Sequence, residues 1–180
     1  MSDALDLAEW IRGRLATPVT HLKLQKLCFY CYGGALASGS ATDVGHISFE
    51  AWAHGPVSRD VWNAYRAYGS AEIEPPGPFD DVVRYRPTTE IELNAVLSIY
   101  RRLSAWQIRQ ESHLEAPWVN AHRQQRSLET EEIRRHFREK FYTGKVAFPE
   151  NLLFSSSLGV DGIPAHTFAT LSEAGAALDG

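Results

Sequence analysis

Two cysteines, Cys28 and Cys31, stand in a C-x-x-C spacing within the stretch KLQKLCFYCYGG. This spacing occurs in redox pairs and in halves of zinc sites. The chain has no other cysteine, so a closed zinc site would need imidazole ligands, for which His113 and His122 are the candidates. A redox pair places its first thiol at a helix N-terminus, whereas these thiols lie about two turns inside a helical pattern. Neither chemistry is favoured by this position.

The residues around the cysteines indicate a packing role instead. Thr20 is a suitable N-cap for a helix predicted over residues 22–37, and the Ser38-Gly39-Ser40 sequence ends it. Because a free cysteine packs as a small hydrophobic residue, we expect both thiols in the core. The predicted buried face of this helix consists of Leu24, Leu27, Cys28, Cys31 and Ala35.

The other reactive side chains form no familiar catalytic pattern. The sequence contains no nucleophile elbow, zincin motif, phosphate loop or dinucleotide-binding fingerprint. His113 and His122 could approach each other across a helix break, and Glu111 and Glu115 are predicted to share one helix face. We expect no catalytic site, no metal and no cofactor. An enzyme that uses His113 with Glu111 or Cys31 is the first rival hypothesis.

Size and composition indicate one folded domain. The chain has 180 residues, 44% of them hydrophobic, which suffices for a core. No apolar run is long enough to span a membrane, and acidic residues occupy the place of a basic signal-peptide start, so we expect a cytoplasmic protein.

The charge balance argues against nucleic acid as a partner. The chain has 18 basic and 22 acidic residues, without the basic excess that phosphate neutralisation demands. A DNA-binding autorepressor is the second rival hypothesis, because a local basic patch could still form on the helical half. It would consist of Arg101, Arg102, Arg109, Arg123, Arg126, Arg134, Arg135 and Arg138.

Helical signals dominate the chain, which predicts a mainly α (α+β) fold: a compact helical domain over residues 1–142 with a short strand or hairpin. Capping boxes are predicted at Thr89 with Glu92 and at Ser104 with Gln107. Strands are predicted over residues 46–52 and 82–85, with a turn at Gly55-Pro56. Helices are predicted over residues 3–15 and 22–37, from Ser58 to Gly69, and from Thr89, Ser104, Pro117 and Thr130 onward.

A C-terminal tail, residues 143–180, has a different composition. From Val146 to Gly180 it carries four acidic residues, no Lys or Arg, and many apolar side chains. It is too apolar for a purely solvating tail, so we expect a segment that docks on something.

Separated blocks in this chain resemble, in order, the motifs of the Panacea domain, a family that includes GepA-like proteins and SocA-like antitoxins. The resemblance covers about residues 3–142. The chain departs from the family motifs at three positions. Members commonly carry Leu or Tyr where this chain has Cys28 and Cys31, and Tyr is frequent where it has His54. The blocks are Thr20 with LKLQKL, Tyr30 and Gly33; FEAW with Gly55-Pro56-Val57, then Val61, Trp62, Tyr65, Tyr68 and Gly69; and Leu103-Ser104 with Ser112-His113 and Pro117-Trp118.

The resemblance implies an antitoxin of a bacterial toxin-antitoxin system, which binds a cognate protein toxin encoded beside it. The SocA-like branch further implies a proteolytic adaptor that hands a SocB-like toxin to the ClpXP protease, with the tail as a candidate tether. A stoichiometric antitoxin that neutralises its toxin without proteolysis is the alternative. We expect no membrane partner, because no apolar run is long enough to span a membrane.

The motif residues fall into predicted contact residues and predicted core residues. For Lys23, Gln25 and Lys26, a solvated helix face is the open alternative to partner contact. The expected partner-binding residues are Lys23, Gln25, Lys26, Tyr30, Gly55, Pro56, Val57 and His113. The expected structural residues are Leu24, Leu27, Trp52, Trp62, Tyr65, Pro117 and Trp118.

Overall fold

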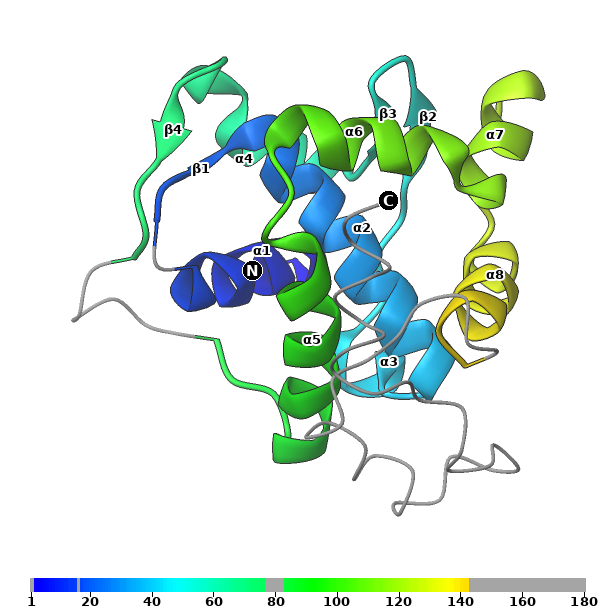
Figure 1. Cartoon of the computed structure of the whole chain (residues 1–180), viewed down its shortest axis with the longest axis horizontal. Helices are drawn as coiled ribbons and strands as arrows, with labels where there is room; N and C mark the ends of the chain where they lie inside the picture. The colour runs from blue at the N-terminus through cyan, green and yellow to red at the C-terminus, as the bar shows by residue number, and fades with distance from the viewer. Residues whose placement is uncertain (1, 16, 77–82, 143–180) are drawn as a thin grey trace.

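The computed structural model describes residues 2–15, 17–76 and 83–142, which form a mainly helical domain with two small antiparallel sheets (Figure 1). The helices are α1 (Asp3–Arg14), α2 (His21–Ser38), α3 (Ala41–Val44), α4 (Arg59–Tyr65) with the 3-10 turn η1 (Arg66–Tyr68), α5 (Pro87–Tyr100), α6 (Ala105–Leu114), α7 (Ala116–Arg123) and α8 (Thr130–Tyr142). Strand β1 (Val19–Thr20) pairs with β4 (Glu72–Ile73), and β2 (Glu50–Trp52) pairs with β3 (Gly55–Val57).

Helix α2 runs through the middle of the domain, and the other long helices pack around it (Figure 1). Its residues from Leu24 to Ala37 are all buried. Two glycines permit the closest approaches: a Cβ on Gly33 would lie 2.2 Å from the ring of Phe137 in α8, and one on Gly34 would lie 2.5 Å from Val96 in α5. The Gly-Gly pair therefore lets α5 and α8 pack directly on α2.

Several local predictions are confirmed. Cys28 and Cys31 are buried in the core, and burial raises the pKa of both thiols. Thr20 caps α2 by accepting a hydrogen bond from the Lys23 backbone N–H, and Ser104 with Gln107 forms the predicted capping box of α6. The apolar repeat of α8 is buried as expected: Ile133, Phe137 and Phe141.

The predicted strand and turn are partly wrong. Only Glu50–Trp52 of the predicted strand belongs to a sheet, while Gly55 and Pro56 belong to β3 rather than to the turn. The hairpin turns at Ala53 and His54, because Trp52 pairs with Gly55 and leaves two residues between them.

Other corrections concern the connection before α5. This helix begins at Pro87, since proline is tolerated in a first helical turn, so Thr89 lies inside the helix and forms no capping box. Residues 83–85 form no strand, and Val82 lies outside the described residues. Ser2 and Ser58 occupy N-cap positions without a side-chain cap hydrogen bond.

The aromatic residues after the hairpin are less buried than predicted. Tyr65 is buried, but Trp52 and Trp62 are only half-buried and form an edge-to-face pair with ring centroids 5.4 Å apart. Trp118 and Pro117 are buried as expected. None of the helices described is long and apolar enough to cross a membrane. The predicted tail lies outside the described residues.

Candidate functional site

Gln25 and Lys26 of α2 form a clamp that holds strand β3 of the hairpin and the adjacent Ser58 from inside the domain. The Gln25 side chain accepts a hydrogen bond from the Ser58 backbone N–H at 2.9 Å and donates one to the Ser58 carbonyl at 3.0 Å. Lys26 Nζ donates to the Pro56 carbonyl at 2.8 Å and is 0% exposed. These bonds satisfy buried backbone groups and fix β3 against α2.

This arrangement corrects the predicted contact surface. Six of the eight predicted contact residues are buried rather than exposed. They contact residues that are distant in the sequence, as Lys26 contacts Pro56 and Tyr30 contacts Glu115. Lys23 is half-buried and donates to the Arg101 carbonyl at 2.8 Å, and His113 is half-buried. The six buried residues are Gln25, Lys26, Tyr30, Gly55, Pro56 and Val57.

Glu115 forms a second interior cluster. Its carboxylate is 3% exposed and accepts hydrogen bonds from the Tyr30 hydroxyl at 2.8 Å, from His136 Nε2 at 2.5 Å and from Lys140 Nζ at 2.5 Å. Burial raises the pKa of Glu115, but the His136 and Lys140 contacts outweigh it and hold that pKa below its usual value. Helix α6 ends at Leu114, so Glu115 turns inward and does not share a helix face with the exposed Glu111, contrary to prediction.

The predicted approach of His113 and His122 takes an unexpected form. Both imidazoles stack on Trp118, with ring centroids at 4.3 Å and 4.6 Å, so the indole lies between them. Trp118 Nε1 donates to the Trp52 carbonyl at 3.1 Å, and His122 Nδ1 lies 3.0 Å from the Ala51 carbonyl. The stack therefore ties α6 and α7 to strand β2. No group of three or more His, Cys, Asp or Glu side chains is placed to hold a metal ion in the described part of the chain.

Helix α6 exposes two large apolar side chains beside this stack. Trp106 is 60% exposed and Leu114 is 75% exposed, and among described residues only Tyr68 of η1, at 46%, joins them as an exposed large hydrophobic residue. Arg109 lies over the Trp106 ring at 4.8 Å and hydrogen-bonds to His54 Nδ1 at 3.2 Å. We define the α6 face as Trp106, Arg109, His113 and Leu114 of α6 together with His54 and His122.

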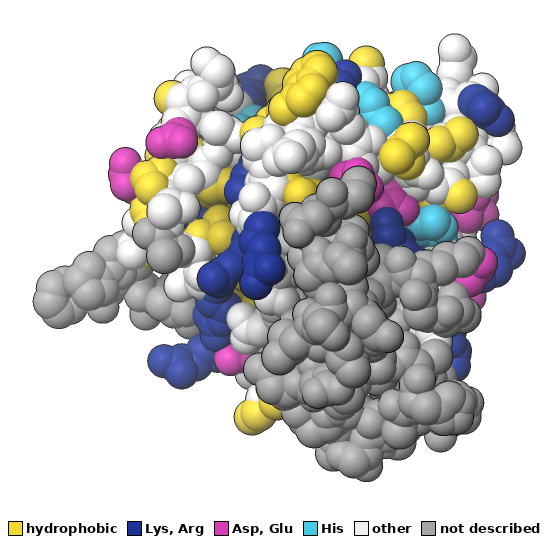
Figure 2. All heavy atoms as spheres, in the orientation of Figure 1, with side chains coloured by type: hydrophobic (Ala, Val, Ile, Leu, Met, Phe, Trp, Pro, Cys, Tyr) yellow, Lys and Arg dark blue, Asp and Glu magenta, His cyan; other side chains and the backbone are white. Residues whose placement is uncertain are grey.

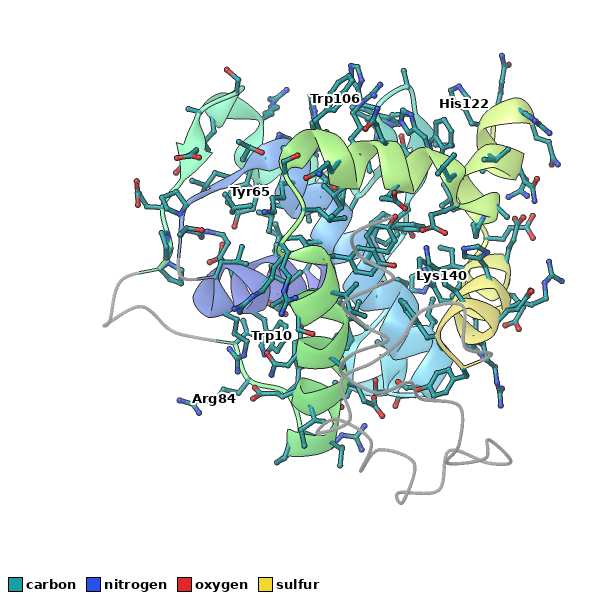
Figure 3. All side chains as sticks on the ribbon, in the orientation of Figure 1. Trp10, Tyr65, Arg84, Trp106, His122 and Lys140 are labelled. Atoms are coloured by element: carbon teal, nitrogen blue, oxygen red, sulfur yellow. The ribbon has the colours of Figure 1, made fainter. Side chains whose placement is uncertain are left out.

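Figure 2 shows hydrophobic and histidine side chains gathered along the upper edge of the molecule, over α6 and α7. In Figure 3 Trp106 and His122 lie along that same edge. A surface pocket lined in part by Trp52 and His122 adjoins the stack. The α6 face thus places exposed apolar groups, imidazoles and a guanidinium along one edge of the molecule.

The electrostatics of the α6 face are positive. Burial lowers the pKa of His113, and the charges of Arg109, Lys26, His54 and His122 lower it further. Burial, with a contribution from Arg109, lowers the pKa of Lys26 to about 7. Within the described residues Arg109 forms no ion pair with a carboxylate. The face therefore has unbalanced positive charge around Arg109.

The rival sites lose support from this geometry. Cys31 is fully buried with a raised thiol pKa, so it is not placed to act as a nucleophile with His113. Two arginines of the predicted basic patch are paired with acids of α8: Arg126 with Glu132 at 2.8 Å, and Arg134 with Glu131 at 3.6 Å.

Sequence reasoning missed Trp106 and Leu114. The buried residues of α6 are Ile108 and Ser112, four apart, and neither Trp106 nor Leu114 falls on that stripe. A large apolar residue on the polar side of an amphipathic helix is the signal that identifies such a surface.

Comparisons of this chain with protein-family models, curated proteins and solved structures find no match.

Proposed function

We propose that this protein is an antitoxin that binds a protein toxin through the α6 face. The observation that carries the proposal is the exposure of Trp106 and Leu114 on one short helix, at 60% and 75%. Large apolar patches on a folded domain mark interaction sites, and Trp and Arg are over-represented among residues that dominate binding energy. Arg109, stacked on Trp106, supplies the second of these residue types in the same place.

The motif resemblance supports the class of partner, and the interior clamp gives its residues a role. Gln25 and Lys26 fix β3, and the carbonyls of β2 accept from Trp118 and His122. Gln25 and Lys26 thereby support the α6 face from behind rather than contact the toxin themselves, whereas the motif residue His113 belongs to that face.

We further propose that the bound toxin is delivered to ClpXP in the cytoplasm, with residues 146–180 as the tether. The support for this step is the resemblance to SocA-like antitoxins and the acidic, apolar composition of that segment. Neutralisation without proteolysis is the alternative outcome.

The test is to purify a tagged copy with the product of the adjacent gene and then add ClpXP and ATP. We expect the partner to co-purify and its half-life to fall only when this protein is present. A partner that binds but stays intact identifies a stoichiometric antitoxin, and the absence of binding contradicts the proposal. Deletion of residues 146–180, with folding checked by thermal unfolding, is expected to abolish delivery and spare binding.

A further inference from the structure

The α6 face lacks a partner within the described part of the chain. Its exposed apolar groups, Trp106 and Leu114, leave a patch that water covers unfavourably. Its Arg109 guanidinium has no carboxylate partner among described residues; it hydrogen-bonds to His54 and lies close enough to His113 for its charge to lower the pKa of that imidazole. A segment that covers this face should therefore offer apolar side chains and carboxylates together.

The chain contains such a segment beyond α8. From Val146 to Gly180 there is no Lys or Arg. The carboxylates are spread along the segment rather than clustered, at Glu150, Asp161, Glu173 and Asp179, and apolar residues lie between them, among them Leu152, Leu153, Phe154, Ile163, Phe168 and Leu171. The segment therefore offers both apolar side chains for Trp106 and Leu114 and carboxylates for Arg109.

We propose that residues 146–180 bind the α6 face of the same molecule when no partner is bound. The regulatory consequence rests on the proposed function: a toxin that binds the same face displaces the segment and releases it to engage the protease. The intramolecular contact itself requires no toxin.

Chain length and connectivity allow this contact. Helix α8 packs against α7, and α7 packs against α6, so the chain leaves α8 two helices from the face. A random coil of about 35 residues spans roughly 30–35 Å (root mean square), which sets the reach available to a chain of this length. Such a tether gives an effective concentration of about 1 mM, so even an intrinsic dissociation constant of about 1 mM would leave roughly half of the molecules closed.

The test is site-specific photo-cross-linking in the full chain at micromolar concentration. Replacing the exposed Gln110 with benzoylphenylalanine places the probe between Trp106 and Leu114 and leaves both side chains intact. The matched control carries the probe at Tyr68, which is exposed on η1. We expect peptides from residues 146–180 to be cross-linked within one chain from position 110, at a yield several-fold above that from position 68.

A second variant separates charge complementarity from simple proximity. The quadruple change Glu150→Gln, Asp161→Asn, Glu173→Gln and Asp179→Asn is expected to lower the cross-link yield from position 110 at least threefold, as is raised salt. Equal yields from positions 110 and 68, or cross-links only between chains, would overturn the proposal. An unchanged yield in the quadruple variant would overturn it as well. Toxin co-purification is a separate readout, so failure of either proposal can be recognised independently.

Discussion

Helices α2 and α6 differ in which residues they bury and which they expose. Helix α2 buries Gln25 and Lys26, polar residues that a surface helix would expose, whereas α6 exposes Trp106 and Leu114, which a core would bury. The polar groups of α2 are satisfied by backbone groups of β3 and by Ser58. Nothing described covers the apolar groups of α6.

This contrast separates scaffold from recognition surface. Buried polar groups with complete hydrogen bonds specify how the elements fit together, because a misplaced element would leave them unpaired. Exposed apolar groups do not contribute to how the elements fit together, and they contribute binding free energy when a partner covers them. Substitutions in the two regions should therefore differ in whether they change stability or binding.

The largest effect is expected in the interior at Glu115. Glu115→Ala leaves His136 and Lys140 without their shared carboxylate and should lower the free energy of unfolding by about 3–5 kcal/mol. Urea unfolding measures this loss, with Glu111→Ala as the exposed control expected to change stability by less than about 0.5 kcal/mol. Equal effects of the two substitutions would contradict an interior role.

The pH dependence of the same residue gives a second test. Because the pKa of Glu115 is lowered in the folded state, its contribution is complete above the unfolded value of about 4.3 and is lost as pH falls through the folded value. We expect Glu115→Gln to flatten the acid limb of the stability profile below about pH 5.

The next effect is expected at the clamp. Gln25→Ala removes both side-chain partners of the Ser58 backbone and should cost about 2 kcal/mol. Gln110→Ala on the exposed side of α6 is the matched control. Thermal unfolding of both variants checks the expectation, and a Gln25→Ala melting temperature equal to that of the control would show that the clamp is dispensable.

A pH-dependent effect is expected at Lys26. Its pKa is lowered to about 7 in the folded chain, so the unfolded chain binds more protons between that value and about 10.4. Stability from this group therefore rises with pH across that window. The stability of Lys26→Met relative to the original chain should be highest near pH 6 and fall as pH rises to 9, as measured by urea unfolding. A pH-independent difference would contradict burial of the ammonium.

The smallest effect on stability is expected on the α6 face. Trp106→Ala with Leu114→Ala should change the free energy of unfolding by less than about 0.5 kcal/mol per site, because both side chains are exposed. Leu24→Ala in α2 is the interior comparison, with an expected loss of about 2–5 kcal/mol. A large loss in the α6 variant would assign its side chains to the scaffold instead.

Local signals in the sequence predicted most helices. The Thr20 cap, the Ser104 capping box and the four-residue repeat of α8 depend on neighbours within one or two turns, and all three are confirmed. The hairpin register was not predictable in this way. The Gly55-Pro56 sequence is typical of a turn, yet both residues pair with β2, and the Pro56 carbonyl accepts a hydrogen bond from Lys26.

The burial of the polar residues Gln25 and Lys26 was not predicted from the sequence. Gln25 and Lys26 flank an apolar stripe and look like its polar border, but their partners lie about 30 residues away along the chain. Helix α2 is enclosed on all sides, so a one-face pattern underestimates what it buries. The α6 face was missed for the opposite reason: an apolar residue is expected in the core, but Trp106 and Leu114 lie off the buried stripe that Ile108 and Ser112 define.

The most direct test of the α6 face is the affinity of the adjacent gene product for three versions of the chain. These are the original protein, the Trp106→Ala, Leu114→Ala double variant and a Tyr68→Ala control that removes the other exposed aromatic side chain. We expect the double variant to bind at least about tenfold more weakly and the control to bind normally. Unchanged affinity in the folded double variant would contradict recognition through this face.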